Sequence, residues 1–80
     1  MTEKEALEKA NILYELIMPK LRAIESSGNA GFIHTAINWI CLIEGERNII
    51  TRFKALDRVH IYYKYLIEAE SWLIKLGMSK

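Results

Sequence analysis

The stretch Asp57–Gly77, DRVHIYYKYLIEAESWLIKLG, carries the strongest pattern in the chain. Its polar residues recur at the spacing of one stripe on a helix: Asp57, His60, Lys64, Glu68, Ser71 and Lys75. At the helical rotation per residue, the remaining apolar side chains cover an arc of roughly 240°, whereas a surface helix needs roughly 100°. The pattern predicts a helix over 57–76 that is covered on two sides, either at the centre of the domain or at a subunit interface.

Glu70 lies inside the apolar arc of this predicted helix. A buried carboxylate without a partner is costly, so it needs a hydrogen-bond donor or a proton. We therefore expect Glu70 to be a buried acid. The structural interpretation is a carboxylate paired with a tyrosine hydroxyl or an arginine, or one at the mouth of an interface; the alternative is a functional acid. Asp57 is expected to cap the start of the helix, and Gly77 to end it.

Length and composition indicate one small globular domain. The chain has 80 residues, of which 51% are hydrophobic, and a net charge of +1. This composition excludes a disordered chain and a global basic field for nucleic acid. The single cysteine, Cys41, excludes an internal disulfide framework, and with no signal-peptide pattern it favours the cytoplasm. The longest apolar run, Trp39–Ile43, is too short to span a membrane, so no membrane association is expected.

The first expected helix covers about 3–26. Thr2-x-x-Glu5 has the form of a capping box. Pro19 interrupts the backbone ladder on the polar side of the helix while the apolar stripe stays in phase, so one helix with a kink is expected. A second apolar patch, which is exposed in a monomer, lies outside this stripe and consists of Ile12, Leu16 and Ala23.

The second expected helix covers about 30–54 and follows a loop, with Asn29 as its cap. Gly45 leaves two possibilities open, an end at the glycine or continuation to about Ala55. The apolar residues after Gly45 keep the phase of the helix before it, which favours continuation and a reversal near 55–57. Gly45 then costs about 1 kcal/mol relative to alanine, and we interpret it as a site of close helix approach.

These elements predict an all-α fold, a small three-helix bundle with helices at about 3–26, 30–54 and 57–76. A single core is marginal at this size, and oligomerisation is a common remedy. The excess apolar surface predicts a homo-oligomer, most simply a two-fold dimer. The expected interface consists of Ile12, Leu16, Ala23, Ile61, Trp72 and Leu76.

Catalytic and metal-binding motifs are weak in this chain. Asp57 and His60 have the spacing of a carboxylate–histidine metal pair, but one copy on a solvated stripe favours a cap and an exposed histidine. His34 and Cys41 lie about two helical turns apart, roughly 10 Å, which is too far for direct proton transfer. We expect Cys41 to be a buried structural residue. No enzyme activity, metal or cofactor is expected.

The strongest functional signal is basic and aromatic. Arg47, Lys54 and Arg58 flank the reversal, and Tyr65 lies near Arg58 on the helical wheel. Such a set can hold phosphates and stack on bases. Two hypotheses follow. In the first, the protein is a non-enzymatic, homo-oligomeric interaction protein, such as a phage- or mobile-element-encoded inhibitor or adaptor that binds a protein partner. In the second, it is an oligomer that sequesters an anionic nucleotide-type ligand or binds nucleic acid through these residues.

Overall fold

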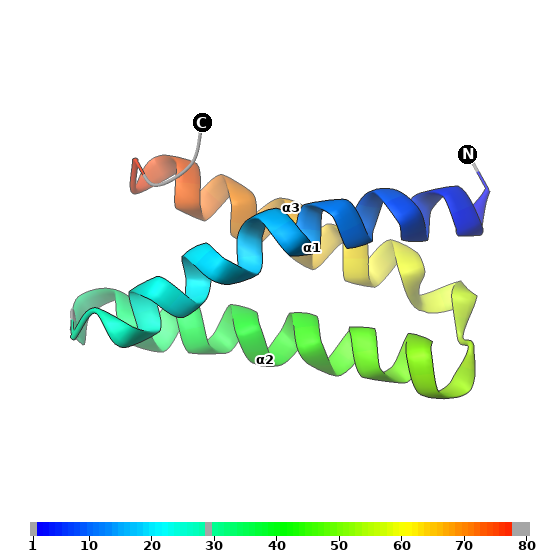
Figure 1. Cartoon of the computed structure of the whole chain (residues 1–80), viewed down its shortest axis with the longest axis horizontal. Helices are drawn as coiled ribbons and strands as arrows, with labels where there is room; N and C mark the ends of the chain where they lie inside the picture. The colour runs from blue at the N-terminus through cyan, green and yellow to red at the C-terminus, as the bar shows by residue number, and fades with distance from the viewer. Residues whose placement is uncertain (1, 29, 78–80) are drawn as a thin grey trace.

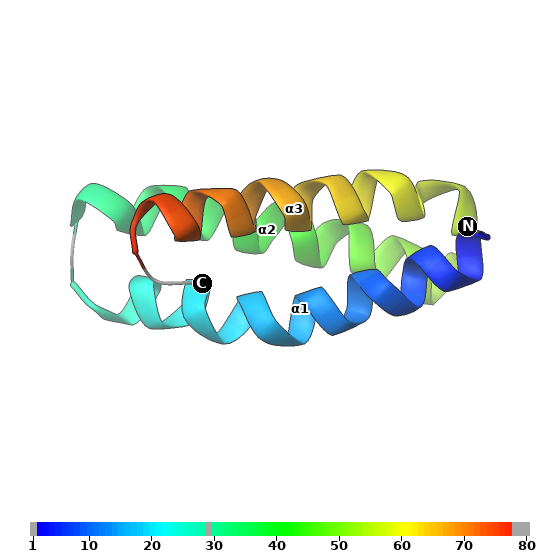
Figure 2. The ribbon, with the colours of Figure 1, turned by 90° about the horizontal axis from the view of Figure 1, so that it is seen from above.

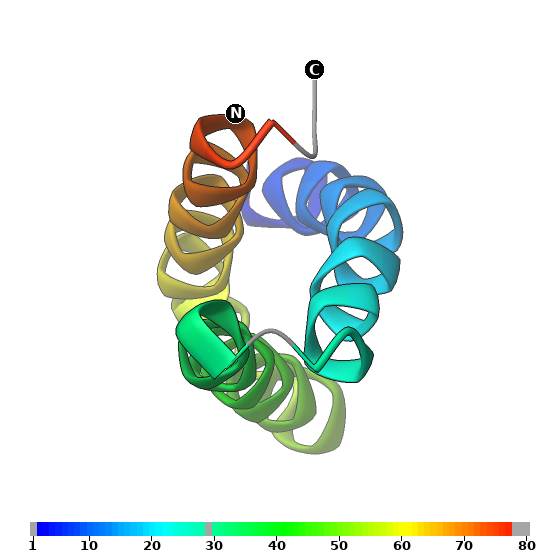
Figure 3. The ribbon, with the colours of Figure 1, turned by 90° about the vertical axis from the view of Figure 1, so that its left-hand side faces the viewer.

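The computed structural model describes residues 2–28 and 30–77. Within these residues the chain forms helices α1 (Glu3–Ser26), α2 (Ala30–Phe53) and α3 (Val59–Lys75), and a short 3-10 helix, η1 (Leu56–Arg58), comes directly before α3. α2 runs antiparallel to α1 and α3, which point in the same direction (Figures 1 and 2). Seen end-on, the helices surround one common axis (Figure 3). The predicted all-α three-helix bundle is confirmed.

The core lies between the three helices. α3 contributes a stripe with alternating spacings of three and four residues, Val59, Tyr62, Leu66, Ala69 and Leu73, which face Ala10, Ile17, Met18, Leu21 and Ile24 of α1 and Ala36, Ile43 and Ile50 of α2. This buried stripe is narrower than the apolar arc that the sequence predicts for the helix over 57–76. Ile67 and Ile74 on α3 remain 46% and 50% exposed. The bundle therefore leaves part of the apolar surface of α3 uncovered.

α1 begins at the predicted cap. The Thr2 hydroxyl accepts a hydrogen bond from the backbone N–H of Glu5 at 3.1 Å and donates one to Glu5 Oε1 at 3.2 Å. Pro19 lies within α1 on its exposed side, and the helix changes direction in its middle (Figure 1). Proline removes a backbone hydrogen bond from the helix, which accounts for a bend there. The prediction of one helix with a kink is confirmed.

The chain reverses direction where the helical phase predicted it. α2 passes through Gly45 and ends at Phe53. Lys54 then adopts the left-handed backbone conformation, with φ of 52°, and the N–H of Leu56 donates to its carbonyl oxygen at 2.9 Å. A reversal of this kind usually uses glycine or asparagine, because a Cβ atom disfavours positive φ. The backbone of Lys54 is therefore strained.

Several local predictions fare differently. Gly77 has a left-handed φ of 77°, as expected for a residue that ends a helix. Asp57 does not cap α3, because it lies inside η1 and Arg58 occupies the capping position without a side-chain hydrogen bond. The interpretation of Gly45 as a site of close helix approach is wrong, since no atom of another helix lies within 4 Å of an added Cβ. The expected cap at Asn29 lies outside the described residues.

Candidate functional site

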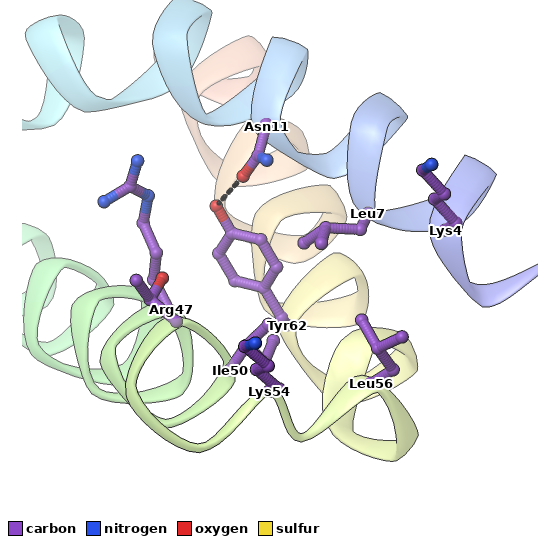
Figure 4. A pocket seen from close by; sticks show the side chains of 9 residues that line it. Lys4, Leu7, Asn11, Arg47, Ile50, Lys54, Leu56 and Tyr62 are labelled. Atoms are coloured by element: carbon purple, nitrogen blue, oxygen red, sulfur yellow. Dashed lines mark hydrogen bonds between the residues drawn. The ribbon is translucent and has the colours of Figure 1, made fainter.

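A cavity of about 350 Å³ opens at the end of the bundle where α1 begins and α2 gives way to η1 and α3 (Figure 4). The residues that line it come from all of these elements: Lys4, Leu7, Asn11, Arg47, Ile50, Thr51, Lys54, Leu56 and Tyr62. Aliphatic side chains and the Tyr62 ring form much of its wall. None of the described lining residues carries a carboxylate. The cavity is thus apolar inside and positively charged at its edges.

Tyr62 crosses this end of the bundle between α3 and α1. Its ring is buried, and its hydroxyl donates a hydrogen bond to Asn11 Oδ1 at 3.1 Å (Figure 4). Burial raises the pKa of Tyr62 to about 12, although the nearby charge of Arg47 acts in the opposite direction. Tyr62 is therefore a neutral phenol at physiological pH. The bond uses only the oxygen of Asn11, so the side chain keeps both amide N–H donors.

Arg47 is held by an aromatic ring rather than by a carboxylate. Its guanidinium carbon lies 4.5 Å from the centroid of the Tyr14 ring. The Tyr14 hydroxyl donates to Glu44 Oε2 at 2.9 Å, and Arg22 Nη2 donates to the same oxygen at 3.0 Å. Burial, and then the bond to Glu44, raise the pKa of Tyr14. Glu44 is thus hydrogen-bonded to Tyr14 and Arg22. The charge of Arg47 is not paired with a carboxylate of the described residues.

The cations of the cavity differ from other basic residues in their pairing. Arg22 and Arg58 form ion pairs with Glu44 and Glu46. No ion pair within residues 2–28 and 30–77 involves Lys4, Arg47 or Lys54. Like charges placed together without counter-charges are unfavourable. Lys4 and Lys54 line the opening without such a partner among the described residues, so a bound anion there would be stabilised.

The structure brings together only part of the predicted ligand site. Arg47 and Lys54 both line the cavity, but Arg58 and Tyr65 do not. Arg58 turns to α2, where Nε and Nη2 donate to the two carboxylate oxygens of Glu46, each at 2.7 Å. These hydrogen bonds lower the pKa of Glu46. The prediction that Arg58 converges with Arg47 and Lys54 is wrong, because the Arg58 guanidinium is paired with Glu46 instead.

Lys4 takes the place expected of Arg58, and sequence reasoning missed it. It lies near the start of α1, on the same helical face as Leu7 and Asn11. That face flanks the main apolar stripe of α1 and carries no motif. Only the packing of α1 against the reversal after α2 brings Lys4 to the cavity (Figure 4).

A second hollow is a shallow groove of about 270 Å³ between α1 and α3. It is lined by Lys9, Ile12, Leu13, Leu16, Tyr63, Ile67 and Glu70. Ile12 and Leu16 are 65% and 58% exposed. Because α1 and α3 run in the same direction, Lys9 lies toward one end of the groove and Glu70 toward the other. The groove is apolar at its centre and oppositely charged at its ends.

Glu70 is not the buried acid that the sequence predicted. It is half-buried at the wall of the groove, and the described residues include no buried charged side chain. The apolar arc of α3 was wide enough to contain it, but only one stripe of that arc packs into the core. The interpretation of Glu70 as a residue at the mouth of an interface stays a prediction.

The predicted interface residues fall into two groups. Ile12, Leu16 and Ala23 are exposed on α1. The remaining three, Ile61, Trp72 and Leu76, are half-buried. Trp72 and Leu76 pack against the core, and the Trp72 ring meets Phe32 edge-on with a centroid distance of 6.3 Å. Trp72 and Leu76 thus contribute to packing within the chain.

The residues considered for metal or thiol chemistry are dispersed. His34 and His60 are exposed. Cys41 is also exposed, so the prediction that it is buried is wrong. Across the described part of the chain, no group of three histidine, cysteine, aspartate or glutamate side chains is close enough to hold a metal ion. None of the helices in that part has the length and apolar character needed to cross a membrane.

Comparison with protein-family models, with curated proteins and with solved structures gives no match for this chain. The cavity at the end of the bundle and the groove between α1 and α3 are therefore the observations on which a function can rest. The cavity has the character of a small-molecule site, and the groove has that of a contact surface.

Proposed function

We propose that this protein is a non-enzymatic helical interaction protein that acts as a homodimer, with the groove between α1 and α3 as the dimer surface. The observation that carries the proposal is the pattern of the groove, an apolar centre between a cation and an anion. An exposed apolar patch with a polar rim is typical of a protein contact. An 80-residue chain has a small core, so burying this patch also adds stability.

The charge pattern favours a second copy of the chain as the occupant. A two-fold axis perpendicular to the helices, through the centre of the groove, reverses the direction of one copy relative to the other. Lys9 of each copy then faces Glu70 of the other, and Ile12, Leu16 and Ile67 meet their counterparts at the centre. A parallel arrangement would instead bring like charges together. Opposite charges at the rim fix orientation more than they add affinity.

We infer that the dimer acts as an inhibitor or adaptor. It would bind a protein partner and catalyse no reaction. We place this role in the cytoplasm, where the single exposed thiol of Cys41 stays reduced. The same proposal includes an origin in a phage or a mobile element.

Light scattering tests the dimer directly. At micromolar concentration the native chain should have at least twice its mass of 9.3 kDa. Leu16→Asp places a charge at the centre of the groove and should give a monomer. Leu42→Asp makes the same change at an exposed leucine on α2, away from the groove, and should leave the dimer intact. A monomeric native chain would overturn the proposal, and dissociation by Leu42→Asp alone would place the contact elsewhere.

Charge reversal tests the orientation of the two copies. Lys9→Glu and Glu70→Lys each put like charges together in the antiparallel dimer, so each should raise the dissociation constant. The double variant restores opposite charges and should recover the native value. If the double variant dissociates more than either single variant, the two residues do not face one another.

A further inference from the structure

We propose that the cavity at the end of the bundle binds a small amphipathic organic anion, with a phosphate or carboxylate group on an apolar or aromatic body no larger than a mononucleotide. This inference is independent of the dimer, because the cavity and the groove share no lining residue. It rests on the charge of the cavity edge, the strain at Lys54 and the shape of the wall.

The charge of the edge selects an anion. Lys4, Arg47 and Lys54 come from separate positions along the chain, and none of them forms an ion pair with a described residue. The whole chain carries a net charge of only +1, so this edge concentrates positive charge well above the average of the surface. An ionic group bound there makes charge-assisted hydrogen bonds, which are stronger than neutral ones.

The backbone at Lys54 supports the same assignment. A left-handed conformation is sterically disfavoured for a residue with a Cβ atom, and Lys54 adopts it with φ of 52°. Glycine would make this reversal without strain but would supply no cation. Backbone strain of this kind gathers at functional sites, where the side chain is needed in one place. Here the strained residue is also one of the residues that line the cavity (Figure 4).

The wall selects the rest of the ligand. Leu7, Ile50 and Leu56 give the cavity an aliphatic lining, and the buried Tyr62 ring adds an aromatic surface. A bare inorganic ion makes no use of such a wall. The volume of about 350 Å³ lies at the lower end of small-molecule sites, which suits a ligand no larger than a mononucleotide. The Asn11 side chain adds a polar group to the lining.

Matched probes test the ligand class by calorimetry and by amide shifts in NMR spectra of the native protein. Adenosine monophosphate is compared with adenosine, and octanoate with octanol; inorganic phosphate supplies the charge without the body. At least one charged probe should bind at low salt about tenfold more tightly than its neutral counterpart, and added salt should weaken it. The nucleotide and the fatty acid arms distinguish an aromatic from an aliphatic body. Inorganic phosphate should bind weakly or not at all.

Lys54→Gly separates loss of binding from loss of folding. It removes a cation and relieves the strained φ, so the thermal midpoint should stay the same or rise while affinity for the charged probe falls about tenfold. Lys4→Ala should also weaken binding, whereas Lys64→Ala, an exposed lysine on α3 outside the cavity, should not. Leu7→Trp fills the cavity without removing charge and should abolish binding.

Three results would overturn the inference. The first is a panel in which no charged probe binds more tightly than its neutral counterpart. The second is equal weakening by Lys4→Ala and Lys64→Ala, which indicates diffuse surface attraction. The third is retained binding in Leu7→Trp with a native thermal midpoint. Leu16→Asp changes no residue of the cavity and should still bind the charged probe as a monomer, so failure of the dimer and failure of this site are distinguishable.

Discussion

Replacing Gly45 with alanine should stabilise the protein, although most substitutions destabilise one. Gly45 lies in the interior of α2 on its exposed side, and apart from the adjoining backbone of α2 no atom lies within 4 Å of the position of an added Cβ. The new methyl group therefore meets no obstacle. Glycine in a helix interior costs about 1 kcal/mol relative to alanine. The gain should be close to that value and should raise the midpoint of thermal unfolding by about 4 to 8 °C for a domain of this size.

Gly28→Ala provides the matched control, because the chemistry is the same and the space around Gly28 is also open. The backbone differs. Gly28 has a φ of 78°, where an alanine is disfavoured by about 1 to 2 kcal/mol. This variant should be destabilised by about 1 kcal/mol, once the lower entropy of unfolded alanine is counted. The two variants should thus differ by about 2 kcal/mol.

Circular dichroism at 222 nm, with heat and with urea, measures both variants against the native chain. The urea dependence of the unfolding free energy should be unchanged, so that shifts in midpoint report stability. A lower midpoint for Gly45→Ala would refute a continuous α2 with an open face at Gly45. A higher midpoint for Gly28→Ala would show that the chain does not reverse there with positive φ. Repeating the melts at several protein concentrations separates these effects from dissociation.

Two other measurements test packing and charge. Leu73→Ala removes a fully buried core side chain and should cost about 3 to 5 kcal/mol, whereas Lys75→Ala on the exposed face should cost less than about 0.5 kcal/mol; equal midpoints would place the wrong face of α3 in the core. The second concerns Glu46, whose pKa in the folded protein is lowered by Arg58. Its contribution to stability is present above the ordinary value of 4.5 and is lost as the pH falls below it. The stability difference between the native chain and Glu46→Gln should therefore shrink between pH 7 and pH 3 in urea titrations, and a constant difference would contradict the ion pair.

The sequence predicted the helices well because hydrophobic phase depends on local spacing. Ile50 and Phe53 keep the phase of the helix before Gly45, and that alone located the reversal. The positive φ of Lys54 could not be predicted from the sequence, since lysine is not a residue that is typical of left-handed turns. The apolar arc of α3 was recognised, but periodicity does not state which stripe of a wide arc faces the core. For that reason Glu70 was expected inside the protein.

The candidate site was predictable only where it depends on the reversal. Arg47 and Lys54 lie on either side of the end of α2, so their proximity follows from local structure. Lys4 reaches the cavity through contacts between segments far apart in the chain. Arg58 leaves it because Glu46 offers a bidentate partner, a choice that depends on the rotation of α3 relative to α2. Such contacts are set by tertiary packing and are not visible in spacing.

On each of α1 and α3, neighbouring residues line the cavity and the groove. Asn11 lines the cavity while Ile12 lines the groove, and Tyr62 and Tyr63 divide in the same way. α1 and α3 are therefore common walls, and a rotation of either helix that narrows one hollow reshapes the other. Thermodynamic linkage makes any such coupling reciprocal, so the factor by which a bound anion alters dimer affinity equals the factor by which dimerisation alters anion affinity. α2 lines the cavity but not the groove. A movement of α2 can therefore alter the cavity and leave the groove unchanged.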